Sequence, residues 1–265
     1  MHDVIYETKG TVSIRSGESA MVPIGTFALL GDRVLHYDPK ESEVAVKKVI
    51  HVFNDSDTPL SPGDMSIFDD GRFVSQVNFN PMIPGDDELI EYGEDSTVDV
   101  SRLVPKKIGK DEITDVLFVT RDDGSGKPRN ERIQVCYKAN RETKYMVKNC
   151  SADKSVSKLY IDHTASPQHG GFLITTSEKC VKKTANFSRF EFSLAPEQEV
   201  EFSVLEEAHY SCNISDLSGL TSFLKKMVPK LLSAGIVDTS FVASLEDLIA
   251  TRQLKQELTN LRNGR

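Results

Sequence analysis

Almost every apolar cluster between Val4 and about Leu205 is short, alternates with polar residues and ends at a turn-forming residue. Residues 44–53 form a long example, and residues 98–104 alternate cleanly before Pro105. Successive side chains of a β-strand point to opposite faces, so a period of two is typical of strands with one buried face. The sequence therefore predicts a mainly β protein over residues 1–208, with antiparallel, β-sandwich-like sheets. Further strands are predicted at 11–15, 133–137, 144–149, 157–163, 171–175, 189–194 and 199–204.

Two of the connections between predicted strands are expected to be hairpins. Asp70-Gly71 lies between two short runs of β-branched and aromatic residues, 64–68 and 72–77. Such a pair favours a tight hairpin turn, because both residues tolerate positive φ. The strands at 189–194 and 199–204 are separated by only four residues, Ala195 to Gln198, which also fits a short hairpin.

The spacing of the apolar residues changes near Ser211, from the period of two of a strand to the spacing of a helix. The apolar residues that follow are spaced as one face of an α-helix; they are Leu217, Leu220, Phe223, Leu224, Met227, Val228, Leu231 and Leu232. Ser215 or Asp216 is the expected N-cap, and Gly235 is the expected residue after the last turn. Pro229 lies inside the run and predicts a kink or an early break.

A second helix is predicted after Asp238-Thr239-Ser240, which completes a C-terminal α-helical hairpin over residues 214–262. Its last apolar residues, Leu254, Leu258 and Leu261, can dock on their own domain or on a partner. The first helix spans only ~20 residues at 1.5 Å each, too few to cover them. We therefore expect these leucines to be at least partly exposed and available for self-association or a protein partner.

The β region is expected to form two subdomains, at 1–104 and 111–208. They would meet at 104–110, where Pro105 and Gly109 interrupt the pattern. Residues 121–129 have no periodicity and predict a mobile loop. This loop is acidic, but it lacks the five-residue run to a terminal Glu that an EF-hand needs.

Composition excludes several classes of function. The net charge of −8 and the scattered lysine pairs disfavour nucleic acid as a partner. No apolar run approaches the ~20 residues of a membrane span, and the first residues lack the pattern of a signal peptide. The four cysteines, at 136, 150, 180 and 212, are too far apart for a zinc knuckle, so we expect buried thiols in a reducing, cytoplasmic location.

Motifs of catalysis are missing from the sequence. It contains no nucleophile elbow, phosphate-binding loop, dinucleotide fingerprint or zinc-protease motif. Asp162-His163 with His169 is the nearest approach to a catalytic set. However, neighbouring residues on a strand point to opposite faces, which favours structural histidines. We therefore predict no catalytic residue, no cofactor and no metal.

The order of short motifs resembles the C-terminal domain of the mucoidy-inhibitor-A-like proteins, a family of unknown function. The motifs cover some 240 residues and are, in order, Val22-Pro23-Ile24, Asn54-Asp55-Ser56 with Pro59–Gly63, Ser66–Val74, Ile83–Asp87, Tyr92-Gly93, Lys148-Asn149, Tyr160–His163, Arg189-Phe190 and Val204–Glu207. The resemblance implies an all-β module followed by helices and implies no catalytic residues. The chain departs from the family at Asn263-Gly264-Arg265, where any longer helical extension is either missing or trimmed.

Two functions from different classes fit this sequence. The first is a non-enzymatic protein-interaction or scaffold domain, which uses strand edges or the terminal helices. The alternative is a surface or secreted ligand-binding β-sandwich, for example for carbohydrate, although the chain has no Trp to stack on a sugar. A hydrolase would depend on Asp162, His163 and His169 alone.

Overall fold

The protein is mainly β, with 49% strand and 18% helix, as the sequence predicts. The computed structural model describes residues 5, 7–8, 10–26, 28–121 and 129–263. The strands are β1 (Leu30–Tyr37), β2 (Val46–Phe53), β3 (Gly63–Asp69), β4 (Arg72–Phe79), β5 (Asp87–Asp95), β6 (Val98–Lys107), β7 (Glu112–Arg121), β8 (Arg129–Asn149), β9 (Val156–Thr164), β10 (Leu173–Ile174), β11 (Cys180–Lys183), β12 (Phe187–Leu194) and β13 (Glu199–Ile214). The helices are the 3-10 turn η1 (Gln168–Gly170), α1 (Leu217–Lys226), α2 (Val228–Ser233) and α3 (Thr239–Asn263).

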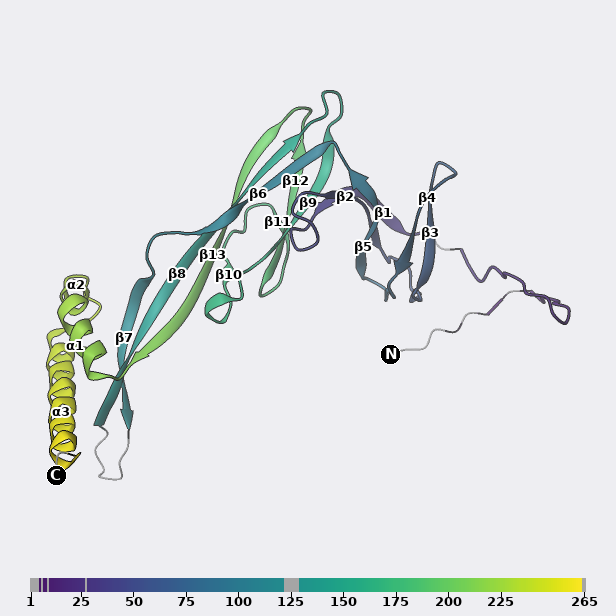
Figure 1. Ribbon diagram of the computed structural model, residues 1–265. Coiled ribbons are helices and arrows are strands. Elements are labelled where there is room, and N and C mark those ends of the chain that lie inside the picture. The colour runs from purple at the N-terminus through teal and green to yellow at the C-terminus, as the bar shows by residue number, and fades with distance from the viewer. Residues whose placement is uncertain (1–4, 6, 9, 27, 122–128, 264–265) are drawn as a thin grey trace. The chain divides into compact units, whose positions relative to one another are not determined.

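The strands form three sheets (Figure 1). The largest has the order β11-β12-β9-β1-β2-β5, and a second has the order β10-β13-β8-β6, with β7 also paired to β8. Strands β3 and β4 form a separate hairpin. Strand β1 pairs with β9 in parallel, with Leu35 opposite Leu159 and Tyr37 opposite Ile161, so the largest sheet is mixed rather than purely antiparallel.

The chain divides into two compact units. Unit 1 comprises residues 1–103, 144–163 and 177–202, and unit 2 comprises residues 104–143, 164–176 and 203–265. The chain passes between units inside β6, β8, β9 and β13. This grouping differs from the contiguous ranges 1–104, 111–208 and 214–262, because strands remote in sequence pair with one another. The segment at 104–110 is largely strand, since β6 continues to Lys107.

The predicted β3–β4 hairpin is confirmed. Asp70 and Gly71 form its turn with φ of 47° and 75°, so both central residues lie in the left-handed region that a type I′ turn requires. Asp69 is opposite Arg72 and Met65 is opposite Val77. A bulge between Ile67 and Phe68 shifts the register inside the hairpin.

Other strand predictions need correction. Residues 11–15 are not a strand, because an alternating pattern forms a strand only where a partner pairs with it. The two strands expected at 133–137 and 144–149 are one continuous strand, β8. Strands β12 and β13 do not form a hairpin with each other; they belong to different sheets, and their facing side chains Phe192 and Phe202 contact with ring centroids 5.1 Å apart.

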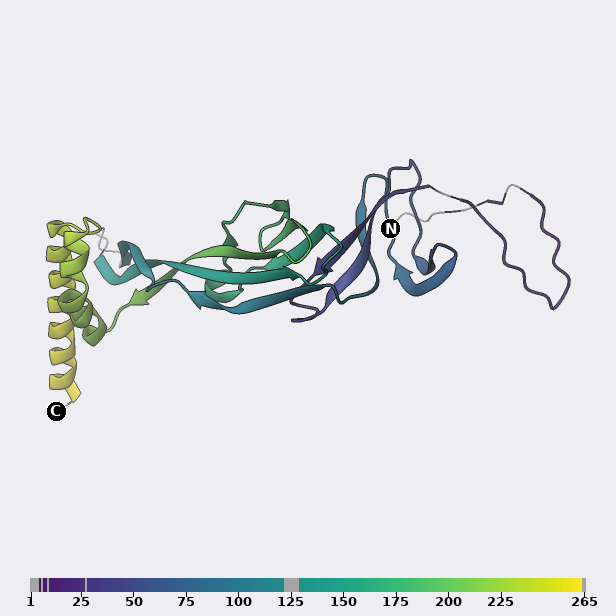
Figure 2. The same cartoon turned by 90° about the horizontal axis from the view of Figure 1, so that it is seen from above.

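Helices α1–α3 cover the β7–β8 pair in unit 2. Leu220 and Phe223 of α1, Leu231 of α2 and Leu245 of α3 are buried in one apolar cluster. The strand residues of that cluster are Ile113, Val116, Ile133 and Val135. Leu217, Leu224 and Met227 are partly buried against the same cluster. The first helical stripe therefore packs on the β region, as predicted, and α1 and α3 lie side by side (Figures 1 and 2).

The helix boundaries follow local chemistry. The Asp216 carboxylate caps α1 by accepting a hydrogen bond from the Gly219 amide at 2.7 Å. Helix α1 ends before Met227, and Pro229 lies in the first turn of α2, where a missing N–H costs little. Gly235 has φ of 70°, and the Asp238 carboxylate accepts from the Phe241 amide at 2.8 Å as α3 begins.

The cysteines are less buried than the sequence predicts. Cys150 and Cys212 are exposed, and Cys136 and Cys180 are half-buried. All four are free thiols. The expectation fails because Cys150 and Cys212 lie at positions that face solvent and the other two are only partly covered, which the apolar character of the thiol does not override.

Asn149 is a buried polar anchor of unit 1. Its amide donates to the carbonyls of Lys154 and Ala195 at 2.8 and 2.9 Å, and its oxygen accepts from the Ser151 amide at 3.0 Å. The sequence has four Asn-X-Ser glycosylation sequons, at Asn54, Asn149, Asn186 and Asn213. Asn54 is buried as Asn149 is, so these two sequons are closed to an enzyme in the folded chain.

Replacing Asn149 by Ala should lower the free energy of unfolding by about 2–3 kcal/mol, because buried backbone groups lose their partners. Urea denaturation measures this change. Asn186→Ala, at an exposed sequon, is the matched control and should have an effect within ~0.5 kcal/mol. Equal effects of the two substitutions would show that Asn149 is not an anchor.

Candidate functional site

Helix α3 has one face that belongs to the core of unit 2. Leu245, Leu248 and Ile249 are buried in the apolar cluster. On the same side Arg252 donates a hydrogen bond from Nη2 to the carbonyl of Glu131 at 2.7 Å. Strand β8 therefore anchors α3 as far as Arg252.

The opposite face of α3 carries the leucines that the sequence singles out. A helix turns by ~100° per residue, so Leu254, nine residues after Leu245, lies about half a turn away from it. Leu258 and Leu261 fall on the same side as Leu254. Their side chains are 61%, 59% and 70% exposed, in the order Leu254, Leu258, Leu261. The predicted exposure is confirmed, and we call these three residues the leucine row.

Two grooves lie along the sides of α3, between its buried face and its exposed face. Gln253 and Gln256 line a groove shared with α1. Thr251, Arg252 and Lys255 line a second groove beside the ends of β7 and β8. The leucine row lines neither groove, and the last turns of α3 extend past α1 and α2 (Figures 1 and 2). The side of the helix with the leucine row is therefore open to a partner.

Unit 1 contains a buried ionic network on one face of its six-stranded sheet. Arg189 of β12 donates from Nε to Asp162 Oδ1 at 2.7 Å and from Nη2 to Asp162 Oδ2 at 2.8 Å. His36 of β1 donates from Nε2 to Asp162 Oδ2 at 2.9 Å. Asp162 and His36 are buried, so this is a charge pair shielded from water.

A second pair lies on the same face. His51 of β2 donates from Nε2 to Asp87 Oδ2 at 2.8 Å, and its Nδ1 is hydrogen-bonded to the Tyr160 hydroxyl at 3.2 Å. Lys182 of β11 also reaches Asp87, with Nζ 3.3 Å from Oδ1. Strands β11 and β5 are the two edges of this sheet, so the sheet curls until side chains from its edges meet.

A small apolar cluster separates the two pairs. Val34, Val49 and Tyr160 are buried together, with Leu89 against them. The register places them between the histidines, because Val34 is opposite Val49 and His36 is opposite Tyr160. The concave face of the sheet is therefore filled by its own side chains.

The electrostatics of the first pair favour the charged forms. Burial raises the pKa of Asp162, but hydrogen bonds from Arg189 and His36 outweigh it, so this pKa lies below its ordinary value. Burial lowers the pKa of Arg189, and the bond to Asp162 outweighs that effect and raises it. The pKa of Asp87 is lowered in the same way, by His51 and Lys182 against the effect of burial.

The three residues of the catalytic alternative have separate environments. Asp162 and His163 point to opposite faces, as predicted: Nδ1 of His163 is hydrogen-bonded to the Tyr145 hydroxyl at 2.7 Å. His169 lies in η1 and stacks on Tyr210, with ring centroids 4.0 Å apart. Both oxygens of Asp162 accept hydrogen bonds from Arg189, so Asp162 is not a free base. The sequence did not reveal that His36 and Arg189 bind Asp162. His36 and Asp162, for example, are 126 residues apart.

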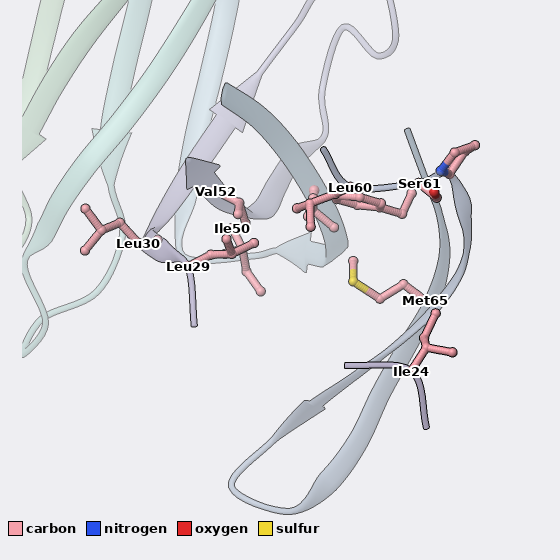
Figure 3. A pocket seen from close by; sticks show the side chains of 12 residues that line it. Ile24, Leu29, Leu30, Ile50, Val52, Leu60, Ser61 and Met65 are labelled. Carbon is pink, nitrogen blue, oxygen red and sulfur yellow. The ribbon is translucent and has the colours of Figure 1, made fainter. Parts of the chain in front are cut away.

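An apolar pocket of about 680 Å³ lies on the opposite face of the sheet in unit 1 (Figure 3). Ile50 and Val52 of β2 form one wall, and Met65 of β3 faces them from the hairpin. The described residues that line it are Ile24, Leu29, Leu30, Gly31, Ile50, Val52, Leu60, Ser61, Pro62, Met65, Phe79 and Ile90. None of these residues is charged, and only Ser61 has a side-chain hydroxyl.

Comparison with known proteins identifies no relative: no family model matches the chain, and neither the curated proteins nor the solved structures give a match. The resemblance to the mucoidy-inhibitor-A-like family therefore stays a prediction. Among the residues that the structure describes, no three His, Cys, Asp or Glu side chains lie close enough to hold a metal ion. Within the same residues no helix has the length and apolar character to cross a membrane.

Replacing Asp162 by Asn should lower the free energy of unfolding by about 3–5 kcal/mol at pH 7, because Arg189 would stay buried without its counter-charge. The pKa of Asp162 is lowered in the folded state, so its stabilisation is full above about pH 4 and disappears as pH falls through the folded pKa. Urea denaturation at several pH values should show the variant and the wild type converging in acid.

Asp64→Asn, at an exposed position on β3, is the control and should change stability little at any pH. A difference between the wild type and Asp162→Asn that is constant down to pH 2 would contradict the charge pair as its cause.

Proposed function

We propose that this chain is a non-enzymatic protein-interaction domain and that the leucine row of α3 is its contact surface. The observation that carries the proposal is the position of Leu254, Leu258 and Leu261 on the side of α3 opposite its own core. Docking α3 more tightly on β7 and β8 cannot bury these side chains. A partner outside unit 2 can remove them from water.

The expected strength of the contact follows from the exposed area. Full burial of a leucine contributes ~1.5–3 kcal/mol, so three leucines that are about 60–70% exposed supply roughly 3–6 kcal/mol. Association costs ~4 kcal/mol or more in lost translational and rotational freedom. The row alone therefore supports a weak contact, and an apolar partner surface of similar size is needed for a stable one.

The polar network supports this proposal over a hydrolase. Asp162 is fully engaged by Arg189 and His36, and His163 is buried against Tyr145. A general base needs a lone pair within reach of a substrate proton. Neither residue offers one to a ligand in this arrangement.

The apolar pocket favours a second candidate function, ligand binding by unit 1. Its walls are mostly apolar, and the volume is within the range of small-molecule sites, ~300–1,000 Å³. A carbohydrate needs several hydrogen-bonding side chains, which this lining lacks. An apolar, chain-like molecule such as a fatty acid fits the chemistry of the lining better than a sugar.

Deleting residues 254–265 should change the melting temperature by less than ~2 °C, because the leucine row contributes little to the core. The same deletion should abolish association through α3, measured by analytical ultracentrifugation. Leu245→Ala, on the buried face of the same helix, is the matched contrast and should cost about 2–5 kcal/mol of stability. A loss of many degrees on deletion would show that the row is ordinary core and would refute the proposal.

For the pocket, a fluorescent fatty acid should bind the wild-type chain, with emission rising as the probe leaves water. Met65→Glu should weaken this binding at least about tenfold, because the ligand would have to share the pocket with a carboxylate. Val74→Glu, on β4 outside the lining, is the control. Absence of binding to the wild type, or equal binding by both variants, would exclude the ligand site.

A further inference from the structure

We propose that the partner of the leucine row is the same segment of a second copy of this chain, with the two α3 helices parallel. This inference rests on the proposed function and specifies its partner. The spacing of the row is its first support. Leu254, Leu258 and Leu261 are four and three residues apart, which is the d-a-d spacing of a heptad seam between paired helices.

The charges beside the row select the orientation. In this register Glu257 occupies position g, and Lys255 and Arg262 occupy position e. In a parallel pair, a residue at g faces the residue at e five positions later on the other helix. Glu257 of each copy then faces Arg262 of the other, which gives two attractive pairs. Lys255 faces the small, neutral Ala250.

An antiparallel pair is disfavoured by the same residues. In that orientation g positions face g positions and e positions face e positions. With Leu254 set against Leu258, Glu257 would lie against Glu257 of the second copy and Lys255 against Lys255. With Leu258 set against Leu261, Lys255 would lie against Arg262. Every charged contact beside the leucines would then be repulsive, so the charge pattern discriminates between the two orientations.

The rest of unit 2 leaves room for this contact. The row lies half a turn from Leu245, so β7 and β8 are on the outer side of each helix in the pair. The grooves that α3 shares with its neighbours lie on its flanks, outside the seam. A second helix can therefore approach the row without displacing any element of unit 2.

The proposed contact between the two α3 helices begins at Leu254. Asp247 is exposed and occupies the d position one heptad before Leu254. In a parallel pair the two Asp247 carboxylates would face each other and repel, so the helices diverge before Leu254. A seam this short predicts a weak dimer whose population rises with protein concentration.

Sedimentation velocity of the full chain over a range of concentrations tests the dimer. We expect a monomer–dimer equilibrium that Glu257→Lys weakens by about tenfold, because two attractive pairs become repulsive. Arg262→Glu should have the same effect, and an equimolar mixture of the two variants should dimerise better than either alone. Glu246→Lys makes the same charge change on an exposed part of α3 outside the seam and is the control.

Disulfide trapping tests the orientation, in a chain whose four native cysteines are replaced by Ser. Leu261→Cys should form a dimer with itself, because equivalent d positions face each other in a parallel pair. An antiparallel pair sets a positions against d positions, so it would instead join Leu258→Cys to Leu254→Cys or to Leu261→Cys when the variants are mixed.

A wild-type chain that stays monomeric at all concentrations would overturn this inference, as would a dimer indifferent to Glu257→Lys. Neither result refutes the interaction domain, since another protein could then occupy the row. That broader proposal fails only if deletion of residues 254–265 destabilises the fold, a result that the melting temperature shows independently of any dimer.

Discussion

Burial of both faces of strand β9 is the constraint on which unit 1 depends. This strand lies inside the six-stranded sheet, between β12 and β1. Leu159 and Ile161 point to one face, and Tyr160 and Asp162 point to the other. A carboxylate in such a position is tolerated only when it is paired and hydrogen-bonded. Arg189 and His36 meet that requirement, and the strands that carry them are the two neighbours of β9.

The curl of this sheet follows from the same requirement. Asp87 on β5 takes hydrogen bonds from His51 and from Lys182 of β11, although β5 and β11 are opposite edges. A flat sheet would leave these side chains far apart. The concave face consequently carries histidines, carboxylates and a small apolar cluster. Space for a ligand exists on the other face, where the β3–β4 hairpin stands away from β2 (Figure 3).

The apolar residues of α3 change from one side of the helix to the other along its length. Up to Arg252 its apolar residues lie on the side that packs against β7 and β8. From Leu254 onward they lie on the opposite side, in water. A shift of the apolar face by half a turn is unfavourable for an isolated chain, because it exposes three leucines without improving the core. The proposed contact between copies gives this shift a physical reason.

Local signals in the sequence were enough for several elements. Asp70-Gly71 determined the β3–β4 turn, because few other pairs accept positive φ twice in succession. Asp216, Pro229 and Gly235 marked the ends of helices through the hydrogen bonds and dihedral angles that each permits. The spacing of Leu254, Leu258 and Leu261 already placed them on one side of a helix beyond the reach of the first.

Only the tertiary structure decided which strands pair. Four residues connect β12 to β13 whether they form a hairpin or cross between sheets, so the turn could not reveal that they separate. The parallel pairing of β1 with β9 joins residues more than 120 positions apart, and no local pattern encodes such a partner. His36 meets Asp162 through that pairing, and Arg189 meets it through the pairing of β12 with β9. Alternation tells which side of a strand is buried, whereas the identity of the neighbour depends on the packing of the whole unit.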